Sequence, residues 1–309
     1  AFGALILSSV AAAFAQVVLG GVVRVTGSGL GCPDWPLCHG QLIPPLEGPV
    51  LIEYSHRLVG AVVSILVIAV AVTSVVFHRR RPAVLVPALA AAALLVVLVV
   101  LGGITVLLEL PPTIVTAHLG IAEALLGILI ALYLTARPAP WEGPAATAGA
   151  QAHVRFRRLA IGAVAAVYLV ILSGAYVRGA GATLACGNQW PLCAGGLLPS
   201  GEPALAHMAH RLFVLAVGLH LLFTAWHGGR LGVPAIAGAA WVMVALFAAQ
   251  VIVGAANPWT SGAPWAQAAH LALGTALWGS AVALATLSWP GQATPLKQPA
   301  GERLSRQRA

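Results

Sequence analysis

The sequence predicts an all-α integral membrane protein in which eight transmembrane helices form two tandem four-helix bundles. Three observations support this fold class. Hydrophobic residues make up 60% of the 309-residue chain and charged residues only 8%, whereas a soluble domain carries about 25% charged residues. Eight long apolar stretches follow one another, and the two halves of the chain resemble each other. Charges are too few to cover a surface in water, so a soluble domain, a disordered chain and a nucleic-acid-binding protein are not expected, despite the net charge of +8.

Each apolar stretch is close to the length that crosses a bilayer as a helix, about 20 residues. Backbone polar groups in lipid must be paired within the segment, which favours helices over isolated strands. The predicted spans are 2–23, 55–77, 83–108, 114–135, 158–178, 208–227, 231–256 and 268–289.

Basic residues set the expected orientation, because cytoplasmic loops of membrane proteins are rich in Lys and Arg. Twelve of the sixteen basic residues follow even-numbered spans: Arg79, Arg80, Arg81, Arg137, Arg155, Arg157, Arg158, Arg230, Lys297, Arg303, Arg306 and Arg308. We therefore expect a multi-pass protein of the cell membrane with both termini in the cytoplasm. The loops that follow the first and fifth spans, which contain the cysteines, are then extracytoplasmic.

An internal repeat relates the two halves at an offset near 154 residues, and near 152 toward the end of each half. Matched residues include Gly20 with Gly174, Trp35–Cys38 with Trp190–Cys193, Gly102 with Gly254, and Gly127 with Gly279. Each half has an even number of spans, so both insert in the same direction, which predicts a pseudo-twofold axis along the membrane normal. The expected organisation is an N-terminal bundle (1–136), a cytoplasmic linker (137–156), a C-terminal bundle (157–290) and a cytoplasmic tail (291–309).

Four duplicated histidines are the main candidates for a binding site: His56, His118, His210 and His270. They lie near the start of the even-numbered spans, all of which enter from the outer side, so we expect them at one depth, two in each bundle. Ionisable groups inside a membrane are costly and usually functional. Two neutral imidazoles facing each other suit the axial positions of a heme iron. The alternative is that these histidines only hydrogen-bond to the loops. His220 lies ~15 Å deeper without a partner on the last span, and we expect it to be an ordinary buried histidine.

Four arginines near the same depth are candidate contacts for heme propionates: Arg24, Arg57, Arg178 and Arg211. A guanidinium group binds a carboxylate through paired hydrogen bonds. The alternative for each is extension of the side chain toward the lipid headgroups.

The four cysteines lie in pairs in two equivalent outer loops. Cys32 and Cys38 share the first, and Cys186 and Cys193 share the second. Because both loops face the oxidising compartment, two local disulfides are expected, Cys32–Cys38 and Cys186–Cys193. The spacing does not suit a zinc site, and a redox-active pair stays an alternative.

Glu53 distinguishes the two halves. It precedes His56 by three residues and so shares its helix face, whereas the matching position of the second half is His207. A carboxylate there could transfer protons or stabilise a cationic intermediate, or it could be a solvated acid at a helix N-terminus. The difference suggests that the first half reacts and that the second holds a permanent electron-transfer heme.

Taken together, the segments EYSHRLVG, TAHLG, HMAHR and AAHLALG, with a cysteine pair in an outer loop, resemble the heme A synthase family over essentially the whole chain. The resemblance implies oxidation of the position-8 methyl group of heme o to a formyl group, giving heme a, by successive hydroxylations. It implies that His56 and His118 hold the substrate heme and that His210 and His270 hold the iron of a heme b cofactor. Glu53 would then be the functional carboxylate.

The resemblance also bears on the cysteines and on partners. Cys32–Cys38 matches the family's functional pair, and Cys186–Cys193 is assigned a structural role. Heme O synthase would supply the substrate, and a heme-copper terminal oxidase would receive the product. Membrane lipid would accommodate the farnesyl tail, no nucleic acid is involved, and a homo-oligomer is compatible with the pattern. Small residues such as Gly102, Gly103 and Gly254 would leave room beside a porphyrin.

Three alternatives keep the same spans. A quinol-linked di-heme electron carrier would show the same histidines but would not need Glu53. A transporter would predict charges near the midplane, where the sequence offers only Glu123, Gln16, Gln250 and His220. A thiol–disulfide oxidoreductase would depend on the loop cysteines.

Overall fold

A computed structural model describes residues 1–137, 149–193 and 196–289 of the chain. Within these ranges the fold is all-helical, and the only β-type pairs are two isolated bridges, Cys38–Gln41 and Cys193–Gly196. The helices are α1 (Phe2–Val25), α2 (Gly48–Phe77), α3 (Pro82–Leu107), α4 (Pro112–Ala136), α5 (Ala150–Gly179), η1 (Ala182–Leu184), α6 (Glu202–Gly229), α7 (Pro234–Trp259) and α8 (Pro264–Leu287). All eight α-helices are long and apolar enough to cross a membrane, which confirms the predicted fold class.

Proline determines where most of these helices begin. A proline occupies one of the first two positions of α2, α3, α4, α6, α7 and α8, where its fixed φ suits a helix and its missing N–H leaves no bond unmade. Helix α2 therefore starts at Gly48, before the apolar run at 55, and α6 starts at Glu202, before the run at 208. Both helices extend beyond the apolar stretch toward the outer loops.

Large apolar side chains cover the outward faces of the helices. Examples are Ile65 and Val72 on α2, Leu215 and Leu219 on α6, and Trp241 on α7, each at least half exposed. Such a surface would be a large apolar patch in water, whereas in lipid it meets a solvent as apolar as itself.

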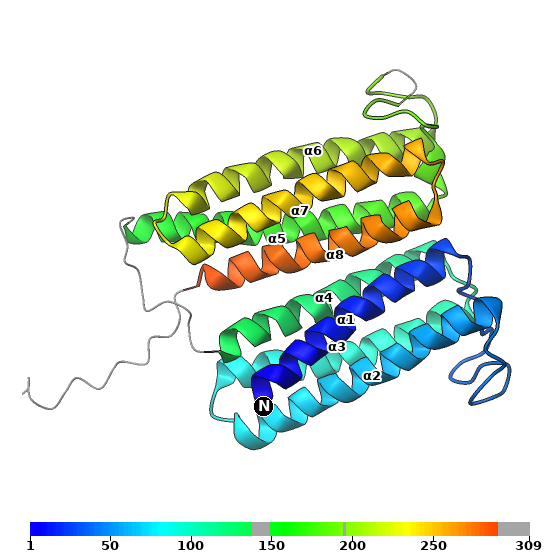
Figure 1. The fold of residues 1–309 in the computed structure, drawn as a ribbon, viewed down its shortest axis with the longest axis horizontal. Coiled ribbons are helices and arrows are strands. Elements are labelled where there is room, and N and C mark those ends of the chain that lie inside the picture. The colour runs from blue at the N-terminus through cyan, green and yellow to red at the C-terminus, as the bar shows by residue number, and fades with distance from the viewer. Residues whose placement is uncertain (138–148, 194–195, 290–309) are drawn as a thin grey trace, which may run out of the picture.

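The helices form two four-helix bundles (Figure 1). In the first, α1 packs on α2 and α4, and α3 packs on α2 and α4; in the second, α5 packs on α6 and α8, and α7 packs on α6 and α8. The bundles meet where α8 contacts α1 and α4 and where α4 contacts α5. The contact of α1 with α8 has its equivalent in the contact of α5 with α4, and α4 contacts its own equivalent, α8. This pattern is consistent with the predicted pseudo-twofold relation. Both disulfide loops lie at one end of the molecule, opposite the N-terminus.

A buried hydrogen-bonded cluster joins the two bundles at this seam. Glu123 of α4 is fully buried, and its Oε1 accepts a hydrogen bond of 2.6 Å from the Thr275 hydroxyl of α8. The indole N–H of Trp278 donates to the Glu123 carbonyl at 2.8 Å, and the Tyr168 hydroxyl of α5 donates to the Gly120 carbonyl at 2.9 Å. Glu123 and Thr275 are matched residues in the repeat, so this pair lies where a twofold axis would pass.

Two of the predicted segments fall largely outside the described residues. The linker expected at 137–156 includes 138–148, which are not described, and its final part belongs to α5, which begins at Ala150. The tail expected at 291–309 is also outside the described residues, together with its four basic side chains.

Candidate functional site

Each of the four duplicated histidines packs against a glycine of a neighbouring helix. A methyl group added at the glycine would lie 3.0 Å from Cε1 of the imidazole at Gly20 and His56, 3.2 Å at Gly102 and His118, 3.3 Å at Gly174 and His210, and 2.9 Å at Gly254 and His270. Any side chain larger than hydrogen would therefore press on the ring. These four glycines, which the internal repeat pairs as Gly20 with Gly174 and Gly102 with Gly254, each leave room for one histidine ring. We call them the glycine seats of the histidines.

The histidines form one pair in each bundle. Each lies about two turns inside the start of its helix, at the end of the molecule that carries the disulfide loops. The two helices that carry a pair, α2 and α4 in the first bundle and α6 and α8 in the second, lie diagonally across the bundle: each packs on the other two helices but not, within the described residues, on its diagonal partner. The structure thus places each predicted pair at one end of one bundle.

Three of the four histidines have a buried ring nitrogen that makes no hydrogen bond to the described residues. The Nδ1 atoms of His56, His118 and His270 are buried and have no hydrogen-bond partner within that part of the chain. The Nε2 atoms of His56 and His270 are 3.3 Å and 3.4 Å from the side-chain amide nitrogens of Gln16 and Gln250. Buried polar groups without partners are uncommon in native proteins, so the unpaired Nδ1 of each of these three rings is a polar atom that the described residues do not satisfy.

This donor set fits a heme rather than a bare metal ion. No group of three or more His, Cys, Asp or Glu side chains that could hold a metal ion occurs among the residues that the structure describes. A heme iron needs only two axial ligands from the protein, because the porphyrin supplies the other four nitrogens. Each bundle has two partly buried imidazoles that lie against glycines, which is the number of protein ligands that a heme iron needs.

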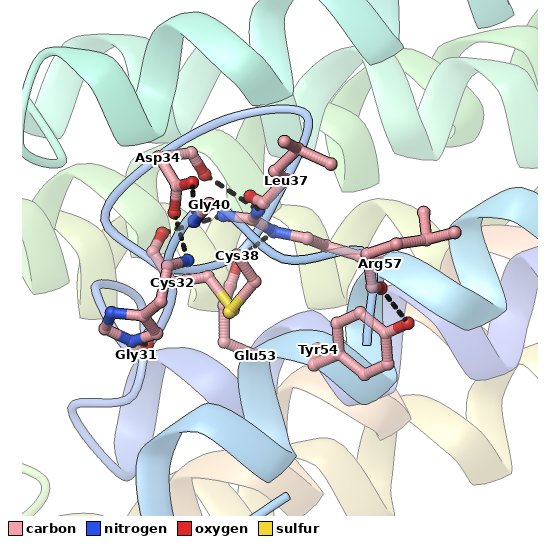
Figure 2. The surroundings of a disulfide bond; sticks show 11 residues. Gly31, Cys32, Asp34, Leu37, Cys38, Gly40, Glu53, Tyr54 and Arg57 are labelled. Atoms are coloured by element: carbon pink, nitrogen blue, oxygen red, sulfur yellow. Dashed lines mark hydrogen bonds and ion pairs between the residues drawn. A yellow bond between two sulfur atoms is a disulfide. The ribbon is translucent and has the colours of Figure 1, made fainter. Parts of the chain in front are cut away.

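The first outer loop is held to α2 by Arg57, the residue that follows the candidate ligand His56. Its guanidinium group donates to the carbonyl oxygens of Asp34 at 2.8 Å, Leu37 at 2.6 Å and Cys32 at 2.8 Å. Its Nε–H donates to Oε1 of Glu53 at 3.1 Å. Figure 2 shows this side chain reaching into the loop that the disulfide closes. The loop, the carboxylate and the histidine helix are thus fixed relative to one another.

Asp34 organises the tip of the same loop. Its carboxylate accepts hydrogen bonds from the backbone N–H groups of His39 at 2.6 Å and Gly40 at 2.7 Å. The Gly40 N–H is the main reason why the pKa of the Asp34 carboxyl lies below its ordinary value; the His39 N–H and the positive charge of Arg57 add to it, and partial desolvation opposes it. His39 also donates from Nε2 to the Gly31 carbonyl at 2.9 Å, so the turn is closed from both sides.

Glu53 lies under this loop, with only 5% of its surface exposed. It is not a solvated acid at a helix end, which was the alternative left open by the sequence. In the second half the matching His207 donates from Nδ1 to the Ala182 carbonyl at 3.0 Å. One half therefore has a buried carboxylate beside its histidine pair, whereas the other has an imidazole that holds a loop.

Both expected disulfides are present, and the described residues contain no free cysteine. Each loop covers the mouth of its bundle. Trp35 of the first loop lies against Gly103, where an added methyl group would be 2.9 Å from the indole. In the second loop Trp190 makes an edge-on ring contact with Trp259 at the end of α7, with centroids 5.7 Å apart. These contacts hold each loop over the end of the bundle that contains the histidine pair.

The arginines predicted to contact propionates divide into two kinds. Arg57 and Arg211 are bound to loop carbonyls; Arg211 donates to Pro191 at 3.1 Å and Leu192 at 2.9 Å. Arg178, at the end of α5, has a buried Nε without a hydrogen bond to any described residue, and Arg24 lies in the last turn of α1. The propionate role stays a prediction for all four, and Arg57 and Arg211 have the additional role of anchoring the loops.

Some contacts to the histidines did not follow from the sequence pattern. Ser173 lies 2.7 Å from Nδ1 of His210, and its only sequence signal is a mismatch in the repeat, because the matching residue is Leu19. Gln16 and Gln250 were noted only as deep polar groups. His220 is hydrogen-bonded, as expected, but only partly buried; it donates from Nε2 to the Leu159 carbonyl at 3.1 Å.

Comparison with known proteins identifies similar chains. A family model described as COX15-CtaA, cytochrome oxidase assembly protein, matches residues 3–282. A protein of Symbiobacterium thermophilum named heme A synthase is 33% identical over 94% of this chain and 96% of its own length. A protein of Exiguobacterium sibiricum with the same name is 30% identical over 70% of this chain and 71% of its own. A third, from Alkalihalophilus pseudofirmus, is 33% identical over 66% of this chain and 68% of its own.

Proposed function

Because the chain belongs to the COX15-CtaA family of cytochrome oxidase assembly proteins, the heme A synthase family, we propose that it oxidises the position-8 methyl group of heme o to a formyl group, giving heme a. The observation that carries this proposal is the pair of glycine-backed imidazoles in each bundle. Heme o binds in the N-terminal bundle between His56 and His118. Heme b binds in the C-terminal bundle between His210 and His270.

The reaction needs an oxygen source and an outlet for electrons. Each of two hydroxylations adds one oxygen from water to the methyl carbon and releases two electrons and two protons, one proton from the C–H bond and one from water. The resulting gem-diol loses water to leave the formyl group. Heme b, when bound, would pass these electrons one at a time to an external electron acceptor. The protein must then hold the substrate, place water beside the methyl carbon and accept protons.

Glu53 is the residue assigned to proton transfer and charge stabilisation. It is buried next to the histidine pair and fixed through Oε1 by Arg57. A carboxylate held in this way can accept a proton from the attacking water and stabilise positive charge that develops on the substrate. Its counterpart His207 donates its Nδ1–H to the Ala182 carbonyl, which supports placing the chemistry in the first half.

The orientation proposed from the basic residues puts this chemistry on the outer side of the membrane. The disulfide loops are then extracytoplasmic and both termini cytoplasmic. Heme o is delivered from the membrane, where its farnesyl tail is soluble, by heme O synthase. Heme a leaves toward a heme-copper terminal oxidase.

Extraction of heme from purified variants tests this function. In a cell that supplies heme o, we expect Glu53→Ala to keep heme b and to accumulate heme o or a partly oxidised form. Glu47→Ala is the matched control, because this exposed acid stands at the N-cap position of the same helix without a side-chain capping hydrogen bond and its loss should leave heme a formation intact. Full heme a production by Glu53→Ala would contradict the role of Glu53.

The same extraction separates an enzyme from a di-heme electron carrier. The protein is produced with and without heme O synthase, and its pigments are compared. A substrate-processing enzyme yields heme o and heme a beside heme b only when the synthase is present. A protein that contains two heme b groups under both conditions would be an electron carrier.

A further inference from the structure

Among the described residues, His210 is the one duplicated histidine whose Nδ1 has a hydrogen-bond partner. The Ser173 hydroxyl of α5 lies 2.7 Å from this nitrogen. The corresponding nitrogens of His56, His118 and His270 are buried and unpartnered in that part of the chain. The four rings share the same glycine seat, so this contact is what distinguishes His210.

The contacts of Ser173 favour one tautomer of His210. The Ser173 hydroxyl also lies 2.8 Å from the carbonyl oxygen of Val170, which can only accept a hydrogen bond, and a serine hydroxyl has one hydrogen. The arrangement that satisfies both contacts gives this hydrogen to Val170 and makes the Ser173 oxygen the acceptor from His210. In that arrangement Nδ1 bears the hydrogen and Nε2 keeps its lone pair.

That tautomer is the one a heme ligand requires. Ligating histidines commonly donate their other ring N–H to a neighbouring acceptor, which fixes the ring and increases the basicity of the ligating nitrogen. In the first half the matching residue is Leu19, which has no acceptor atom in its side chain. The Nδ1 atom of His56 accordingly has no hydrogen-bond partner among the described residues.

We propose that Ser173 is a positioning residue that anchors His210 for permanent heme b binding, and that Leu19 at the matching position leaves the first-half heme exchangeable. The inference rests on the proposed function in placing heme b in the second half and the substrate heme in the first. A substrate heme must enter and leave, so its ligand should not be anchored. A resident cofactor gains from a ligand that is already in place before the heme arrives.

Heme loss from purified protein tests this role. Protein loaded with heme b is mixed with apomyoglobin as an acceptor, and the rate of heme transfer is followed by absorbance. We expect Ser173→Ala to accelerate loss of heme b, in line with the roughly 10-fold to 100-fold affinity cost of removing a partner of a ligating histidine. The Ser173→Thr variant keeps the hydroxyl and should restore slow loss. Ser280→Ala is the control, because among the described residues that hydroxyl bonds only to the Leu277 carbonyl of its own helix.

A redox measurement separates positioning from a packing effect. Loss of the hydrogen bond makes His210 a weaker donor to ferric iron, so the midpoint potential of heme b should rise in Ser173→Ala and return in Ser173→Thr. An unchanged potential together with an unchanged rate of heme loss in Ser173→Ala would overturn the proposal.

The reciprocal variant covers the case in which Ser173→Ala does not fold. Leu19→Ser introduces the hydroxyl beside His56, and we expect it to slow release of heme o from the first half while heme b is unaffected. Release at the wild-type rate would count against the proposal. A wild-type protein that binds no heme at all would instead refute the proposed function, so the two failures are distinguishable.

Discussion

Substitution of Gly254 by alanine tests the glycine seats directly. The added methyl group would lie 2.9 Å from Cε1 and 3.4 Å from Nδ1 of His270. Non-bonded carbons prefer about 3.5–4.0 Å, so the imidazole has to retreat by roughly 0.6–1 Å or the two helices must separate. Either movement takes Nε2 away from the position where an axial ligand would bind iron.

The expected effect follows from the cost of overpacking, about 1–3 kcal/mol. If this cost is borne by the heme-bound state, the affinity for heme b drops roughly 5-fold to 150-fold. The helix itself should not suffer, because alanine favours a helix over glycine by about 1 kcal/mol. We therefore expect a folded protein with a depleted C-terminal heme.

Absorbance of the Soret band per protein, with pyridine extraction to identify the heme, measures this outcome. Gly238→Ala is the control on the same helix, since nothing lies within 4 Å of an added methyl group there, and it should retain full heme b. Gly102→Ala should deplete heme o in the first half but leave heme b in place. Wild-type heme b content in Gly254→Ala, or loss of heme b in Gly102→Ala, would refute the assignment of the seats to the two hemes.

Three further predictions concern the loop and the seam. Lysine cannot reproduce the four directed hydrogen bonds of Arg57, so Arg57→Lys should destabilise the first loop by roughly 2–4 kcal/mol. Arg211→Lys removes only two such bonds to the second loop and should have a smaller effect. Limited proteolysis of the two loops compares the variants. Since the pKa of Asp34 is lowered in the folded loop, its hydrogen bonds stabilise the loop above about pH 4 and are lost as the pH falls through the lowered value. Reduction of the first disulfide by a phosphine should accelerate below that pH in the wild type, and Asp34→Ala should be fast throughout. Thr275→Val removes the donor to buried Glu123 and should cost about 1–3 kcal/mol in thermal unfolding, whereas Thr275→Ser should restore stability.

The spans and the histidine pairs were predictable because they depend on properties that the sequence states directly. Lipid demands long apolar helices, so all eight were found. The early starts at Gly48 and Glu202 were missed because Glu53 in the first segment, and Glu202 and His207 in the second, interrupt the apolar run. The proline in the first turn of each of these helices was the available signal. The duplicated His56 and His210 stood out because a rare residue recurred in the same register.

Contacts between helices were less predictable because they depend on how each helix is rotated. The repeat indicated Gly102 and Gly254, but only the packing shows that they support the rings of His118 and His270. Glu123 was read as an isolated deep acid, whereas it meets its own repeat counterpart, Thr275, across the seam. No sequence rule predicts which residues a twofold axis brings together before the helices are placed.

The differences between the halves are small and lie beside the histidines. Both halves keep the same four-helix frame and the same glycine seats, while Glu53 is exchanged for His207 and Leu19 for Ser173 in the repeat. Polar side chains are costly within a membrane. Packing alone therefore does not explain a buried carboxylate in one half and a hydroxyl bonded to a histidine in the other. Each polar residue lies next to one histidine pair and not the other. A duplicated scaffold can thus acquire a reactive site and a resident cofactor site through a few polar substitutions, with the apolar packing that sets the ring positions left unchanged.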